Sequence, residues 1–67
     1  MAEKTVGTRI QEIREVMGWS QRELARLAGM NVSEISRLES GERPATEGQI
    51  IKLADSLRVD RATLLEG

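Results

Sequence analysis

The chain has 67 residues, enough for one small domain, and its 39% hydrophobic residues include a single aromatic side chain, so any core must be aliphatic. Cysteine and histidine are both absent, which excludes disulfides, thiolate or imidazole catalysis and the usual zinc ligands; we expect no metal, no cofactor and no enzymatic activity. Ten basic residues against eleven acidic ones give a formal net charge of −1, which excludes a surface that is strongly basic throughout.

The distribution of apolar residues sets the expected boundaries and compartment. No apolar run approaches the length of a signal-peptide core or a membrane span, so we expect a soluble, cytoplasmic protein that does not enter membranes. Residues 1–5 show neither a helix cap nor an apolar pattern and are predicted to form a flexible tail. A single domain is predicted over residues 6–67.

The first predicted helix begins at Val6. Apolar residues recur there every three or four positions, which is the spacing that lines one face of a helix. The inward face is predicted to consist of Val6, Ile10, Ile13, Val16 and Met17. Gly18 is the predicted stop signal.

The second helix is predicted to begin after Ser20. Ser20 and Glu23 have the spacing of a capping box, in which each side chain accepts from the other residue's free backbone amide. Trp19, directly before the cap, is expected to pack beside the helix as a hydrophobic staple. The inward residues are Leu24, Ala25, Leu27 and Ala28, and Gly29 ends the helix.

Asn31 is the predicted cap of a third helix, with Glu34 as its reciprocal partner. Ile35 and Leu38 form the inward stripe of this helix, which ends at Gly41. Pro44 prevents helix in the segment that follows.

Thr46 and Gln49 repeat the capping-box spacing and predict the start of a fourth helix. The apolar positions that follow are spaced for one helix face, at Ile50, Leu53, Ala54 and Leu57. Asp60 then precedes a short last helix that is expected to bring Leu64 and Leu65 onto the core. Five helices joined by short turns predict a compact all-α domain.

The second and third predicted helices have the features of a rigid mount for an exposed helix. Ala25 is small enough for a close crossing, Gly29 accepts a tight bend, and the inward stripe anchors only one side of the third helix. Its other side stays free. Such a helix fits the major groove of B-DNA, which is about 12 Å wide.

Several motifs resemble those of the phage-repressor and Cro-like (XRE-type) helix-turn-helix family. They occur in order over residues 6–67 and read Ser20-Gln21-x-x-Leu24-Ala25-x-x-Ala28-Gly29, Ile35-Ser36-Arg37-Leu38-Glu39-Ser40-Gly41, Leu53-Ala54-x-x-Leu57-x-Val59 and Leu64-Leu65-x-Gly67. The resemblance implies a five-helix, lambda-repressor-like DNA-binding domain.

The resemblance also implies roles for individual residues. Val32, Ser33 and Arg37 would face the bases, with Arg37 able to donate two hydrogen bonds to guanine. Backbone phosphates would be held by Gln21, Ser40 and Arg43, and Arg22 is a further candidate because it is basic and lies on the second helix, as does Arg26. Arg14 and Glu39 match an internal ion pair of the family, and Arg58 stands where a glycine usually ends the fourth helix.

Structural alternatives stand beside these roles. Val32 would equally pack on its own capping turn, and Ser33 would equally solvate the first turn of its helix. Glu34 is expected to cap the third helix, and it also lies three residues before Arg37, which is the spacing of a surface ion pair.

Two functions are compatible with these features. The first is a sequence-specific regulator of transcription, most simply a repressor, that binds double-stranded DNA as a homodimer with two third helices about 34 Å apart on a partly palindromic operator. The alternative is an antitoxin-like module whose main partner is another protein, which the slightly acidic balance favours.

Overall fold

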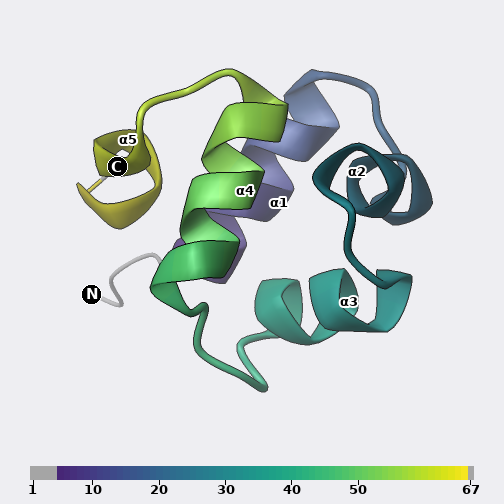
Figure 1. Ribbon diagram of the computed structural model, residues 1–67, viewed down its shortest axis with the longest axis horizontal. Helices are drawn as coiled ribbons and strands as arrows, with labels where there is room; N and C mark the ends of the chain where they lie inside the picture. Colours follow the sequence, from purple (N-terminus) through teal and green to yellow (C-terminus); the bar gives the residue numbers. More distant parts are fainter. Residues whose placement is uncertain (1–4, 67) are drawn as a thin grey trace.

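A computed structural model describes residues 5–66, and every regular element within that range is an α-helix. In chain order the helices are α1 (Val6–Val16), α2 (Gln21–Ala28), α3 (Val32–Ser40), α4 (Glu47–Leu57) and α5 (Arg61–Glu66) (Figure 1). The predicted all-α class with five helices is confirmed. None of the helices within residues 5–66 is both long and apolar enough to cross a membrane.

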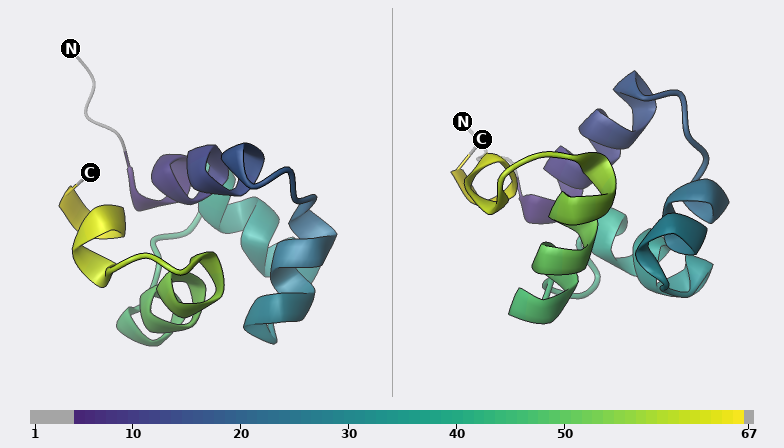
Figure 2. Two further views of the ribbon diagram at one scale, coloured as in Figure 1. Left: turned by 90° about the horizontal axis from the view of Figure 1, so that it is seen from above. Right: turned by 45° about the horizontal axis from the view of Figure 1, so that its top comes forward.

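Helices α1 and α4 lie side by side at the centre of the molecule (Figure 1). Helices α2 and α3 lie on one side of this central pair and α5 lies on the other, as two further views also show (Figure 2). Helix α1 contacts α3, α4 and α5, whereas α2 contacts α3 and α4. Each short helix therefore packs against at least one of the two longer central helices.

Two helices begin with the predicted reciprocal caps. At α2, the Ser20 amide donates to Glu23 Oε1 at 2.9 Å and the Glu23 amide donates to Ser20 Oγ at 3.1 Å. Thr46 and Gln49 make the same pair of bonds at α4, at 3.0 and 3.1 Å. These bonds satisfy amides that have no carbonyl partner within the helix, so they fix where each helix begins.

The start of α1 differs from the prediction. Thr5, which the sequence assigns to a flexible tail, is the N-cap of α1, and its Oγ1 accepts a hydrogen bond from the Thr8 amide at 3.1 Å. Threonine is a favoured capping residue, but the Glu or Gln that completes a capping box is absent here. The placement of residue 5 in the tail is therefore wrong, and the remaining tail residues, 1–4, lie outside the described residues.

The core is aliphatic, as the composition requires. Its apolar residues come from all five helices and are Ile10, Leu24, Ala25, Ala28, Ile35, Leu38, Ile50, Leu53, Ala54, Leu57 and Leu64. Trp19 is half-buried against this cluster, in agreement with its predicted role as a staple beside the start of α2. The predicted inward faces of α3 and α4 are confirmed.

Four residues predicted to face inward are exposed instead. Val16 is 88% exposed because it ends α1 and lies six residues, or about 240° of helical rotation, beyond the buried Ile10. Met17 follows the last residue of α1, and Leu27 lies at the edge of the face that the two alanines of α2 bury. Leu65 is half exposed because a six-residue helix buries only its neighbour Leu64.

Arg58, which stands where the family usually has a glycine, ends α4 in a left-handed conformation with φ 60° and ψ 43°. Its amide donates to the carbonyls of Ala54 and Asp55, which closes the last turn as a glycine would. A side chain in this conformation destabilises the turn by about 1 kcal/mol relative to glycine.

The last helix is held by a contact that the sequence analysis did not anticipate. Arg9 of α1 donates from Nη1 to the carbonyl oxygens of Leu64 at 3.1 Å and Leu65 at 2.7 Å. Carbonyls in the last turn of a helix lack amide partners, and a cation there also complements the helix dipole. Arg9 therefore ties the end of α5 to α1.

Gly7 is the point of closest approach between α1 and α3. A Cβ atom at this position would lie 1.7 Å from the Leu38 carbonyl oxygen and 3.2 Å from the Glu39 Cα. Both atoms belong to the backbone of α3, so they cannot move aside without moving the helix. A residue without a side chain is therefore required for α3 to pack where it does.

We expect Gly7→Ala to lower the free energy of unfolding by about 1–3 kcal/mol, because the overlap outweighs the higher helix propensity of alanine. Gly48→Ala is the matched control, since a Cβ on Gly48 in α4 would meet no atom within 4 Å. The control is expected to gain up to about 1 kcal/mol. Urea unfolding followed by Trp19 fluorescence measures both, and equal effects would contradict this account of Gly7.

Candidate nucleic-acid interface

Gly29 makes the corner between α2 and α3. It adopts φ 67° and ψ 36°, a left-handed conformation, and its amide donates to the carbonyls of Ala25 and Arg26. The Met30 amide then donates to the Ala25 carbonyl at 2.8 Å. The chain therefore breaks at Gly29 as predicted, and α3 starts in a new direction (Figure 1).

The start of α3 is fixed by Glu34, whose Oε1 accepts a hydrogen bond from the Asn31 amide at 2.9 Å. Its second oxygen lies 3.5 Å from Nε2 of Gln49 on α4. The predicted capping role of Glu34 is thus confirmed. The alternative prediction, an ion pair between Glu34 and Arg37, is wrong. Arg37 pairs with Glu42 instead, with 3.9 Å between Arg37 Nε and Glu42 Oε2.

The buried side of α3 carries Ile35 and Leu38, which leaves its other side to the solvent. The three predicted base-reading residues all lie on this free side: Val32 is 43% exposed, and Ser33 and Arg37 are exposed as well. Ser36 is exposed between them, although it was not predicted as a site residue. Ser36 lies three residues after Ser33 and four residues before Ser40, and residues at these spacings are neighbours on one helix face. This spacing is the sequence signal that could have identified Ser36 as a site residue.

The predicted phosphate-binding residues lie on α2, at the end of α3 and in the turn after α3. Arg22 is exposed on α2, and Ser40 and Arg43 are exposed at the end of α3 and in the turn that follows. The Ser40 hydroxyl donates to the Arg37 carbonyl at 3.1 Å, so it must rotate before it could donate to a phosphate. Gln21 is different, because its side chain is half-buried and takes part in an internal network.

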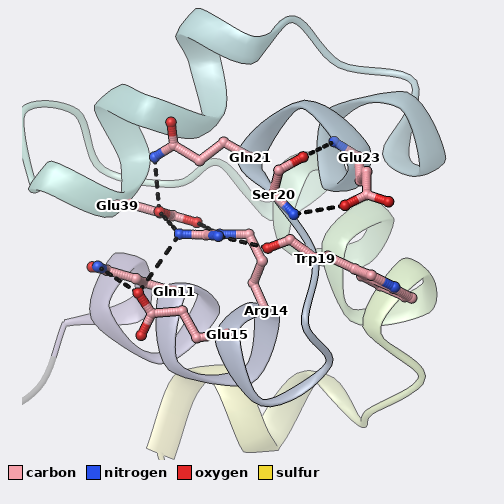
Figure 3. Close-up of polar contacts among 8 residues, drawn as sticks. All are labelled: Gln11, Arg14, Glu15, Trp19, Ser20, Gln21, Glu23 and Glu39. Carbon is pink, nitrogen blue, oxygen red and sulfur yellow. Dashed lines mark hydrogen bonds and ion pairs between the residues drawn. The ribbon is translucent and has the colours of Figure 1, made fainter.

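Glu39 is the centre of that network (Figure 3). Arg14 of α1 donates from Nε to Glu39 Oε2 at 2.8 Å and from Nη2 to Glu39 Oε1 at 3.0 Å, which confirms the predicted ion pair. Gln21 of α2 donates from Nε2 to the same Oε1 at 2.9 Å. Arg14 also donates from Nη1 to the Trp19 carbonyl at 2.7 Å. The Glu39 carboxylate on α3 thus joins α1 and α2 directly, and Arg14 extends the network to the loop between them.

The network is buried: the side chains of Arg14 and Glu39 are only 11% and 4% exposed. Hydrogen bonding to Glu39 raises the pKa of Arg14, burial opposes that rise, and the charges of Glu39 and Glu15 add to it. Charged groups taken out of water are stable only with such close partners. The network therefore fixes the orientation of α3 relative to α1 and α2.

The Gln21 amide is oriented by this contact, because the carboxylate accepts and so must face the nitrogen (Figure 3). An amide nitrogen carries two hydrogens. The second hydrogen leaves Gln21 able to donate to a phosphate oxygen while the network stays intact. Sequence reasoning found the residue but missed its internal role, since Glu39 lies 18 positions away.

The charges of the α2–α3 region explain how a chain with a net charge of −1 presents a basic surface. Three of its four acids are engaged within the fold, because Glu23 and Glu34 cap helices and Glu39 is buried against Arg14; the fourth, Glu42, is exposed beside Arg37. The basic side chains of this region are exposed and comprise Arg22, Arg26, Arg37 and Arg43. Among the described residues, no group of three or more acidic side chains is placed to hold a metal ion.

Glu39→Gln keeps the size of the side chain but removes the buried counter-charge of Arg14. We expect the free energy of unfolding to fall by about 3–5 kcal/mol, measured by urea unfolding. Glu15→Gln is the matched control, because Glu15 lies 4.0 Å from the same arginine yet is 59% exposed; its expected loss is below about 1 kcal/mol. Similar losses for both variants would show that Glu39 is not the central partner.

Comparison with known proteins gives one family. The helix-turn-helix family model matches residues 10–64, which covers most of the chain from α1 into α5. A search of curated protein sequences finds no significant match.

Solved structures share the whole arrangement of helices. The restriction-modification controller protein C.AhdI from Aeromonas hydrophila is 35% identical, with 90% of this chain and 91% of that chain covered at a TM-score of 0.86. The P22 c2 repressor in complex with synthetic operator 9T is 25% identical, with coverages of 97% and 98% and a TM-score of 0.89. The DNA-binding domain of the same repressor in solution gives 25% identity, coverages of 100% and 88%, and a TM-score of 0.93. The chain therefore belongs to the helix-turn-helix family of phage-repressor and Cro-like (XRE-type) DNA-binding proteins.

Proposed function

We propose that the chain is a sequence-specific regulator of transcription that binds double-stranded DNA through α3. The observation that carries this proposal is the mounting of α3: one side is anchored by the core and by Glu39, and the other side is free and bears Arg37. A rigid helix with a free polar side is the element that enters the major groove in helix-turn-helix proteins. The P22 c2 repressor, similar over nearly its whole length, binds an operator.

Base recognition would come from the first two turns of α3. Arg37 has the geometry to donate two hydrogen bonds to O6 and N7 of one guanine, and Val32 offers a methyl contact to thymine. Ser33 can donate or accept at a neighbouring base edge. Because only Arg37 makes a bidentate contact, we expect it to contribute most of the discrimination between bases.

Phosphate contacts would hold the helix in register. Gln21 and Arg22 begin α2, whereas Ser40 ends α3 and Arg43 lies in the turn after it. In the sequence these residues therefore precede and follow the base-reading residues. Such contacts orient a protein on the duplex without reading its sequence. Binding energy from phosphates also makes the affinity fall steeply with salt.

We propose further that two copies bind together and act as a repressor in the cytoplasm. A partly palindromic operator would place two α3 helices about one helical turn, or 34 Å, apart. A dimer seated in this way would block access to the underlying DNA without any catalytic step. Dimerisation would also double the number of phosphate contacts, which compensates for the small basic surface of one copy.

Selection from random duplexes at low salt, followed by the same selection with Arg37→Ala, tests this function. We expect a defined motif for the unchanged chain, and for the variant a loss of preference at one base pair with binding weaker by about 1–3 kcal/mol. Arg61→Ala is the matched control, since Arg61 also loses one exposed ion pair, to Glu47 at 3.7 Å, but lies on α5.

The control should keep the whole motif. A motif unchanged by Arg37→Ala would remove Arg37 from base recognition. Absence of any duplex binding at low salt would contradict the function itself and favour a module that binds another protein.

A further inference from the structure

Glu42 is the one acid of the α2–α3 region that neither caps a helix nor takes part in the buried network around Glu39. It follows α3 in an exposed turn, and its Oε2 lies 3.9 Å from Nε of Arg37. The side chains are 68% and 49% exposed, respectively. An exposed acid beside a DNA-binding surface repels phosphates, so its position requires an explanation beyond DNA affinity.

The turn holds the Glu42 backbone firmly in place. The Glu42 amide donates to the Arg37 carbonyl at 3.0 Å and to Ser40 Oγ at 3.3 Å. The Arg43 amide donates to the same carbonyl at 3.3 Å, and so does the Ser40 hydroxyl at 3.1 Å. The Arg37 carbonyl therefore organises the turn that brings the carboxylate of Glu42 beside the side chain of Arg37.

The ion pair engages the Nε side of the guanidinium group. The other two nitrogens, Nη1 and Nη2, make no hydrogen bond within residues 5–66. A guanidinium group offers five donors in a rigid plane. At 3.9 Å the carboxylate makes no hydrogen bond, but its charge on the Nε side favours one orientation of that plane and leaves the terminal donors available. The terminal donors are sufficient for a bidentate contact with guanine.

We propose that Glu42 is a positioning residue for DNA recognition: it orients Arg37 toward a guanine and, by its charge, lowers the affinity for DNA in general. This inference rests on the proposed base-reading role of Arg37. Orientation of Arg37 raises the affinity for the operator, whereas the negative charge of Glu42 lowers the affinity for every duplex. Only the orientation therefore changes the discrimination between base pairs. A residue that only maintained the fold would produce neither effect.

The expected size of each effect follows from the exposure of the pair. Exposed ion pairs couple weakly, so removing the charge should change discrimination at the base pair read by Arg37 by about two- to fivefold. Loss of one negative charge near phosphates should raise the affinity for an unrelated duplex by a similar factor. Both changes are measurable by equilibrium binding at fixed salt.

The experiment measures binding of the full chain to three duplexes: the selected operator, the same operator changed at the base pair that Arg37 reads, and an unrelated sequence. For Glu42→Gln we expect stronger binding to the unrelated duplex and reduced discrimination at that base pair alone. Glu42→Asp keeps the charge but shortens the reach, so it should reduce the discrimination and leave the affinity for the unrelated duplex unchanged.

Two further variants separate the causes. Glu47→Gln is the matched control, because it removes the same charge from an exposed ion pair, to Arg61 at 3.7 Å, on another part of the molecule; discrimination should not change. In the Arg37→Ala background, Glu42→Gln should alter general affinity and have no effect on discrimination. Unfolding curves followed by Trp19 fluorescence check that each variant is folded.

The outcomes are distinguishable. If Arg37→Ala changes the motif but Glu42→Gln and Glu42→Asp leave discrimination intact, the inference about Glu42 is overturned and the proposed function stands. If Arg37→Ala leaves the motif unchanged, the base-reading role and the role of Glu42 are overturned together. Reduced discrimination by both Glu42 variants, with the control unaffected, supports the proposal.

Discussion

The buried carboxylate of Glu39 is the constraint on which the recognition surface depends. It accepts hydrogen bonds from Arg14 of α1 and Gln21 of α2, so the helix to be placed in DNA is fixed to both preceding helices at one point. The close approach at Gly7 brings α1 and α3 together at the same place, because its Cβ position is filled by the backbone of α3. Packing and charge pairing therefore determine the same orientation of α3.

The same arrangement reconciles an acidic composition with a DNA-binding function. Net charge describes the whole molecule, whereas a duplex meets only one surface of it. Acids near that surface are engaged at helix starts, such as Glu23 and Glu34, or paired inside the fold. The exposed charges that remain there are mostly arginines. Glu42 is the exception, and its contact with Arg37 gives that exception a role in orientation.

Most of the fold could be predicted because its signals are local. Capping pairs such as Ser20 and Glu23, the corner at Gly29 and the helical spacing of the core leave a pattern in the sequence itself. The contacts that were missed join distant positions: Arg9 reaches carbonyls 55 and 56 residues away, and Gln21 reaches Glu39 across the corner. Val16 was misplaced because its three-residue spacing from Ile13 satisfies the local pattern, although it lies about 240° around the helix from the buried Ile10.

The same difference between local signals and contacts that depend on the folded chain applies to the candidate site. The base-reading candidates on the free side of α3 could be named from the family resemblance, whereas the partners that orient them depend on how the turn after α3 folds back. The most direct test of the account is a structure of the chain bound to its selected duplex. The account predicts that α3 lies in the major groove with the Arg37 guanidinium group on a guanine. A duplex bound to another face, with α3 turned toward solvent, would contradict it.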